Sequence, residues 1–150
     1  MAPKKYVLDT NCFIDASRDP RAREAYTAFC ATVAPGLYLS AVVGAELRAG
    51  TASARERRTL EDDVLAPYVR RARVLTPSAR SWEGLGETLS RLREESGLQL
   101  RQTPKSFVFD ILVAHTCREA GAILVSRNTK DLRRIAAVFP FEHVEPYPDM

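Results

Sequence analysis

The chain has 150 residues, of which 45% are hydrophobic and 27% charged, and its formal net charge is +3. These values favour one globular domain over residues 1–150 and argue against a disordered chain. No apolar run approaches the ~20 residues that a membrane helix needs, and Asp9 ends the first run too early for a signal peptide. We therefore expect a cytoplasmic protein without a membrane partner.

Short apolar runs alternate with longer amphipathic segments, which indicates an α/β fold around a parallel sheet. In chain order, the expected strands are 6–8, 37–39, 74–75, 122–125 and 141–144. The expected helices are 20–33, 41–48, 54–67, 77–96, 107–120 and a last one from 129 to near 140. Each follows a residue type that caps helices: Asp19, Ser40, Ser53, Thr76, Ser106 and Asn128.

Three further features are expected to be structural. The odd number and wide spacing of Cys12, Cys30 and Cys117 predict reduced thiols, without a disulfide framework or zinc site. Trp82 begins an apolar stripe that is typical of a core or a subunit contact. His115 and His143 lack a spaced catalytic partner.

Four acidic residues lie near the expected strand ends or helix starts. Asp9 follows the first strand, Glu46 lies on the helix after the second, Asp110 lies in the first turn of the 107–120 helix, and Asp131 follows the 122–125 strand. Because open parallel sheets bind ligands at the carboxyl ends of their strands, these acids could meet in one crevice. Helix capping, dipole stabilisation or a solvated position remains a structural alternative for each of them.

Converging carboxylates would need a cation, because two of them ~4 Å apart repel by about 4 kcal/mol at an effective dielectric constant of ~20. Oxygen ligands without nearby histidine or cysteine suit Mg²⁺ or Mn²⁺ better than zinc. Such an ion activates water and stabilises charge on phosphate oxygens. The pattern therefore predicts metal-assisted hydrolysis of phosphodiesters.

Four blocks of the sequence resemble, in order, the motifs of PIN-domain proteins. They are Val-Leu-Asp-Thr-Asn at 7–11, Ser40 with Glu46, Phe-Asp-Ile-Leu-Val-Ala at 109–114, and Leu-Val-Ser-Arg-Asn-Thr-Lys-Asp-Leu at 124–132. The resemblance covers essentially the whole chain. Its length and arrangement are most similar to the VapC group of ribonuclease toxins from type II toxin–antitoxin systems.

This resemblance implies a three-layer α/β/α, Rossmann-like fold with a central parallel sheet. It also implies an endoribonuclease that depends on Mg²⁺ or Mn²⁺ and hydrolyses RNA with a metal-activated water. Asp9, Glu46 and Asp110 would be catalytic metal ligands. Many relatives carry an acid at the position of Asn128, so either Asn128 or Asp131 could complete the ligand set, and the number of metals stays open.

Residues beside these acids have expected roles too. Thr10, Asn11, Ser126 and Asn128 would orient the carboxylates or the substrate. The basic residues that flank the last block would contact RNA phosphates: Arg127, Lys130, Arg133 and Arg134.

The resemblance further implies a cognate VapB-type antitoxin and a homodimer. The main alternative is a catalytically weak PIN-like module that binds RNA or protein without cutting, which Asn128 in place of an acid would allow. A receiver-like domain that is phosphorylated on Asp9 is less favoured, because no lysine follows the last strands at the required place.

Overall fold

The computed structural model describes residues 3–150. Its centre is a five-stranded parallel sheet in the order β3-β2-β1-β4-β5. The strands are β1 (Lys5–Leu8), β2 (Leu37–Ser40), β3 (Val74–Leu75), β4 (Ala122–Val125) and β5 (His143–Val144). The predicted parallel α/β fold is confirmed, and β1 is the middle strand between β2 and β4.

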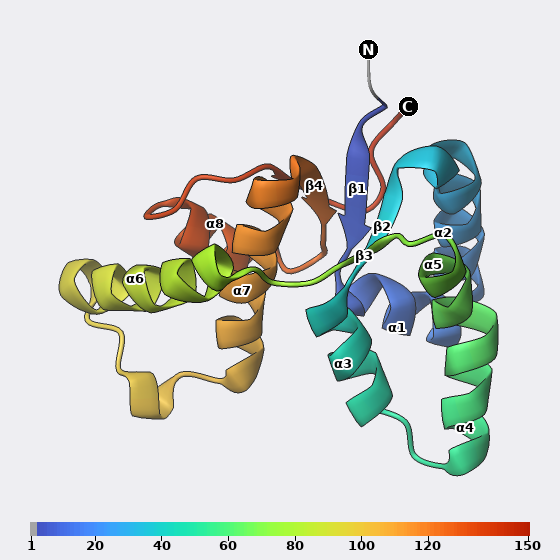
Figure 1. Ribbon diagram of the computed structural model, residues 1–150, viewed down its shortest axis with the longest axis horizontal. Coiled ribbons are helices and arrows are strands. Elements are labelled where there is room, and N and C mark those ends of the chain that lie inside the picture. The colour runs from blue at the N-terminus through green and yellow to red at the C-terminus, as the bar shows by residue number, and fades with distance from the viewer. Residues whose placement is uncertain (1–2) are drawn as a thin grey trace.

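Helices cover both sides of this sheet. In Figure 1, α6 (Ala79–Ser96), α7 (Lys105–Ala120) and α8 (Thr129–Ala136) lie to its left. To its right lie α1 (Thr10–Arg18), α2 (Pro20–Val33), α4 (Ala54–Thr59) and α5 (Ala66–Arg70), while α3 (Ala41–Ala49) extends below the strand ends. Short 3-10 turns occupy Ala34–Gly36 and Leu100–Gln102. The arrangement is the expected three-layer α/β/α architecture.

Several predicted helix ends are confirmed by their hydrogen bonds. The Asp19 carboxylate accepts from the backbone N–H of Arg21 at 2.9 Å, and the Ser40 hydroxyl accepts from Val42 at 3.2 Å. Gly97 and Gly121 end α6 and α7 with φ angles of 69° and 70°. This left-handed conformation is strained for residues that carry a Cβ atom, which explains glycine at both positions.

The first part of the chain differs from the prediction in two places. Helix α1 was not predicted: it begins immediately after Asp9, because the Asp9 backbone and side chain cap it. The expected helix from Ser53 to Pro67 changes to π-helical geometry over Leu60–Leu65 and then continues past Pro67 to Arg70. Pro67 is tolerated because it lies in the first turn of α5.

Three predicted helix caps in the second part were also wrong, although the last helix does begin at Thr129 as expected. Ser78, not Thr76, caps α6 by accepting from the N–H of Ser81. Helix α7 begins at Lys105 after Pro104, so Ser106 is not its cap and Asp110 lies beyond its first turn. Asn128 precedes α8 but its side chain makes no capping bond, and α8 already ends at Ala136.

The core lies between the sheet and both helix layers. Val7, Leu124 and Val125 of the two central strands are 0% exposed, and Ile111 of α7 packs against them with the same value. Full burial of each such side chain contributes roughly 1.5–3 kcal/mol. Trp82 is 57% exposed and is therefore not a core residue, whereas Leu85 and Leu92 of the same stripe are buried. Within residues 3–150, no helix combines the length and apolarity needed to span a membrane.

Candidate active site

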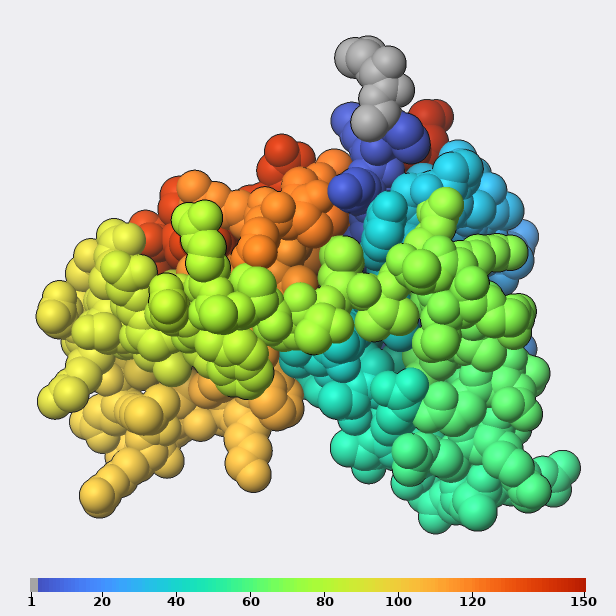
Figure 2. Space-filling view, in the orientation of Figure 1, coloured from blue at the N-terminus to red at the C-terminus, as the bar shows by residue number. Residues whose placement is uncertain are grey.

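The predicted acids gather at the carboxyl ends of three neighbouring strands. Asp9 directly follows β1, Ser40 ends β2, and Ser126 directly follows β4. The pairing of Leu8 with Val125 brings Asp9 beside Ser126, and the Asp9 N–H donates to the Val125 carbonyl at 2.9 Å. Figure 2 shows a notch at this edge of the molecule, between the surfaces of α6–α7 and α3–α4.

Asp9 is the most enclosed of the acids, with 3% of its surface exposed. Its Oδ1 accepts from the N–H of Thr10 at 2.8 Å, and its Oδ2 accepts from the Ser126 hydroxyl at 2.7 Å and from the Asn11 amide at 3.4 Å. Burial raises the pKa of Asp9, while the hydrogen bonds from Ser126 and Thr10 lower it. The three donors hold the carboxylate in one orientation.

Glu46 reaches this site from α3. The Thr10 hydroxyl donates to its Oε1 at 3.0 Å, which links α3 to the start of α1. The pKa of Glu46 is raised by burial and, to a lesser extent, by the charge on Asp9, while the Thr10 bond lowers it. Thr10 therefore contacts both carboxylates, one through its backbone and one through its side chain.

Asp110 and Asp131 are joined by the side chain of Asn128. The Asn128 Nδ2 donates to Oδ2 of Asp110 at 2.9 Å and to Oδ2 of Asp131 at 3.2 Å. Burial raises the pKa of Asp110 to about 8, with added contributions from Asp9, Glu46 and Asp131, and the Asn128 bond opposes the rise. The same three acids contact residues that contact one another, because Thr10 joins Glu46 to Asp9, and Ser126 joins Asp9 to Asn128.

The helix cap predicted for the Asn128 side chain is thus absent, and its amide donates to two acids. The Asn128 backbone N–H donates to the Ser126 hydroxyl at 3.0 Å, and the Asn11 Nδ2 donates to the same oxygen at 3.0 Å. Ser126 is 0% exposed. It therefore connects the Asp9 part of the site to the Asn128 part.

The four basic residues predicted to contact RNA differ in what their side chains contact. The Arg127 guanidinium forms an ion pair with Asp15 of α1 at 2.8 Å, which the sequence did not predict because α1 itself was missed. The Arg134 guanidinium lies over the Phe107 ring, 4.9 Å from its centre. Lys130 and Arg133 are exposed. His115, expected to be structural, binds the Thr88 hydroxyl at 2.8 Å and stacks on Phe139.

The donor set of the acid cluster fits a hard divalent cation. Its charged ligands are all carboxylates, and no ion pair within residues 3–150 involves Asp9, Glu46, Asp110 or Asp131. In their present positions, however, no three histidine, cysteine or acidic side chains of the described residues form a closed metal cage.

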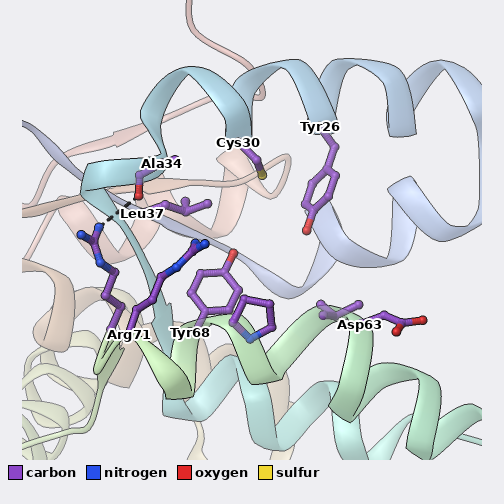
Figure 3. A pocket seen from close by; sticks show the side chains of 10 residues that line it. Tyr26, Cys30, Ala34, Leu37, Asp63, Tyr68 and Arg71 are labelled. Atoms are coloured by element: carbon purple, nitrogen blue, oxygen red, sulfur yellow. Dashed lines mark hydrogen bonds between the residues drawn. The ribbon is translucent and has the colours of Figure 1, made fainter.

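A separate pocket of about 190 Å³ lies between α2 and α5. Figure 3 shows Tyr26, Cys30 and Tyr68 around it, with Arg71 at its margin. Burial raises the pKa of Cys30 to about 11, which keeps this thiol protonated at neutral pH. None of the predicted site residues lines this pocket.

The protein is thus a parallel α/β domain that carries a cluster of acids at the carboxyl edge of its sheet. The chain belongs to the PIN domain family, whose sequence pattern matches residues 6–138. PIN domains are in general nucleases and typically use divalent metals. No curated protein matches the chain in sequence.

Solved structures of low sequence identity share the fold. DNA-bound VapBC from Salmonella typhimurium is 19% identical with a TM-score of 0.71, and covers 96% of this chain and 99% of its own. VapBC2 from Rickettsia felis, bound to a promoter DNA fragment, is 22% identical with a TM-score of 0.66, covering 93% and 97%. A toxin–antitoxin complex from Klebsiella pneumoniae is 23% identical with a TM-score of 0.56, covering 97% and 100%.

Proposed function

We propose that this protein is a metal-dependent endoribonuclease and the toxin of a type II toxin–antitoxin pair. The observation that carries the proposal is the gathering of Asp9, Glu46, Asp110 and Asp131 at the carboxyl edge of the sheet, where hydrogen bonds through Thr10, Ser126 and Asn128 connect the four acids. Buried acids without a compensating charge destabilise a fold, so packing alone does not explain them. Such a cluster is instead typical of a functional site.

Asp9, Glu46 and Asp110 would hold Mg²⁺ or Mn²⁺, with Asp131 or Asn128 completing the set. When bound, the ion would lower the pKa of a water and stabilise negative charge on the phosphate. Ser126 and Asn11 orient the Asp9 carboxylate, and Thr10 orients Glu46. Asn128 donates to both Asp131 and Asp110, so it holds the Asp131 carboxylate next to Asp110, where it would bind the ion or hydrogen-bond a water on it.

The substrate is proposed to be RNA, bound at the notch beside the acids. Lys130, Arg133 and Arg134 of α8 are exposed cations on the helix that carries Asp131, so they can neutralise backbone phosphates. Arg127 has its charge already paired with Asp15, and we expect it to contribute less to RNA binding. The antitoxin partner and a homodimer are proposed from the shared fold with the toxin–antitoxin structures.

The decisive experiment uses purified protein, free of antitoxin, with single-stranded and structured RNAs in Mg²⁺, in Mn²⁺ and in EDTA. We expect cleavage only with a metal, and none by Asp9→Asn or Asp110→Asn. Arg58→Ala is a matched surface control, because Arg58 is exposed on α4, outside the cluster. Cleavage that persists in EDTA or in both variants would contradict the proposal.

A binding module without activity is the second candidate. It is favoured by the neutral side chain of Asn128, which lies between Asp110 and Asp131 and adds no carboxylate ligand to the site. Tight RNA binding by the wild type, with no cleavage in either metal, would select this function.

A further inference from the structure

A second hollow adjoins the acid cluster on the side of α8. It encloses about 400 Å³ between the end of α6, the loop after it, the start of α7, and α8. Asp131 belongs both to its wall and to the acid cluster, through its bond from Asn128. A ligand in this hollow would therefore lie next to a group held at the proposed cleavage site.

The wall of this hollow carries unused hydrogen-bonding groups. Gln99, Gln102 and Ser106 are exposed, and their side chains make no hydrogen bond to the described residues. A glutamine amide both donates and accepts, so it can match the edge of a nucleobase, whose donors and acceptors alternate. Because ordinary solvated loops are also polar, a binding wall is distinguished from them by its shape and rigidity.

The loop that presents the glutamines is internally fixed. The Gln99 carbonyl accepts from the Gln102 N–H at 3.0 Å and from the Thr103 hydroxyl at 2.7 Å. Gly97 anchors its other end, where its N–H donates to the Arg93 carbonyl at 3.1 Å. A wall that is held before binding loses less conformational entropy when a ligand arrives.

A cation stands at the α8 side of the same hollow. Arg134, three residues after Asp131, lines it while the Phe107 ring supports its guanidinium. Its N–H groups make no hydrogen bond within residues 3–150, so they remain available to a phosphate or a base. The volume lies within the ~300–1,000 Å³ of small-molecule sites, which is more than one inorganic ion needs.

We propose that this hollow is a subsite for one nucleobase of the RNA strand, adjacent to the phosphodiester at the acid cluster. Gln99, Gln102 and Ser106 read the base edge, and Arg134 binds the attached phosphate or stacks on the base. The subsite rests on the proposed ribonuclease function and deepens it, because it would select which nucleotide flanks the cleaved bond.

Binding to the hollow can be measured without cleavage, by NMR signals from side chains of the protein. Its only side-chain amides are Gln99 and Gln102 in the hollow and Asn11 and Asn128 in the acid cluster, and its single tryptophan, Trp82, is exposed on α6. In ¹⁵N-labelled full-length protein, each of the four side-chain amides gives a pair of NMR signals and the indole gives one. The probes are the four ribonucleoside 5′-monophosphates, each titrated in EDTA.

We expect the Gln99 and Gln102 signals to shift and to saturate, while the Trp82 indole signal stays in place. One monophosphate should bind at least about fivefold more tightly than the weakest, because a good pair of base contacts discriminates by that much. Absence of shifts at both glutamines with all four probes, or equal shifts at Trp82, would overturn the subsite.

Variants then connect the subsite to cleavage. Gln102→Ala and Gln99→Ala should relax the nucleotide preference at one position flanking the cut, read by sequencing the ends of a cleaved random RNA pool. Cleavage with an unchanged preference in both variants contradicts the subsite alone. Monophosphate binding at the glutamines without cleavage in any metal contradicts the nuclease proposal and leaves a base-binding module.

Discussion

The Nδ2 atom of Asn128 lies 2.9 Å from Oδ2 of Asp110 and 3.2 Å from Oδ2 of Asp131. One neutral amide thus lies between two carboxylates, where a cation would otherwise reduce their repulsion. Both carboxyl groups accept a hydrogen bond from this amide, so the stability of the protein should be sensitive to residue 128.

Replacing Asn128 by Asp removes both hydrogen bonds and adds a charge to the cluster. We expect Asn128→Asp to be destabilised by about 1–3 kcal/mol in EDTA, and to recover most of this loss in millimolar Mg²⁺. Thermal unfolding in the two conditions measures the effect. Asn128→Ala, which loses the bonds without gaining charge, is the control and should respond less to Mg²⁺. An unchanged Tm of Asn128→Asp in EDTA would contradict this account.

The pKa of Asp110 predicts how stability depends on pH. The unfolded chain releases this proton near the ordinary value of 3.8, while the folded protein retains it until about pH 8. Because the folded state binds more protons across that window, stability should fall as pH rises from about 4 to about 8 in EDTA. The raised pKa values of Asp9 and Glu46 act in the same direction.

Urea unfolding of wild type and Asp110→Asn at several pH values tests this dependence. The variant should be more stable than wild type near pH 8 and should lose a large part of the slope. Added Mg²⁺ should reverse the trend in the wild type, since metal binding requires the deprotonated carboxylates and strengthens as pH rises. A slope of the same size in the variant would assign the pH dependence to other groups.

Asp9 and Asp131 should differ in their importance for cleavage. Asp9 is buried with three donors on its carboxylate, whereas Asp131 is half-buried and accepts one bond, from Asn128. Asp9→Asn should reduce kcat by more than about 100-fold, which exceeds the 10–100-fold effect of losing a residue that only supports a ligand. Asp131→Asn should reduce kcat by less. Equal losses in matched single-turnover series would make Asp131 a full ligand.

Thr10 should act by positioning Glu46 through its hydroxyl. Thr10→Ala removes the 3.0 Å bond, and we expect Mn²⁺ affinity to fall about 10-fold. Titration calorimetry measures this affinity without RNA. Thr10→Ser keeps the hydroxyl and should restore most of the affinity. If Ser and Ala variants bind Mn²⁺ equally, the hydroxyl does not position Glu46.

The packing of α6 on α7 gives a prediction about stability alone. A Cβ atom at Gly84 would clash with the His115 ring, which stacks on Phe139 with ring centres 3.6 Å apart. Gly84→Ala should therefore cost about 1–3 kcal/mol. Gly86→Ala, in the same helix with nothing within 4 Å, should instead gain roughly 0.5–1 kcal/mol. Urea unfolding separates the two, and a neutral Gly84→Ala would show that His115 can move away.

The sequence by itself determined the fold class and the identities of the four clustered acids. Buried strands such as Ala122–Val125 are short apolar runs flanked by residues that cap helices or reverse the chain. Because these signals lie within a few residues of one another, the sequence alone shows them. The motif spacing placed Asp9, Glu46, Asp110 and Asp131 near strand ends or on flanking helices. Parallel strands bring their carboxyl ends to one edge, so convergence followed from the fold class.

Only the tertiary structure decided which side chain contacts which. Asn128 and Asp131 have the spacing of a capping box, yet the Asn128 side chain makes no capping bond and its amide donates to Asp110, 18 residues earlier in the chain. Likewise, the ion pair of Arg127 with Asp15 depends on a helix that the sequence did not reveal, while the contact of Arg127 with RNA stays a prediction. Local patterns report backbone preferences, whereas such contacts depend on residues brought together by the sheet order.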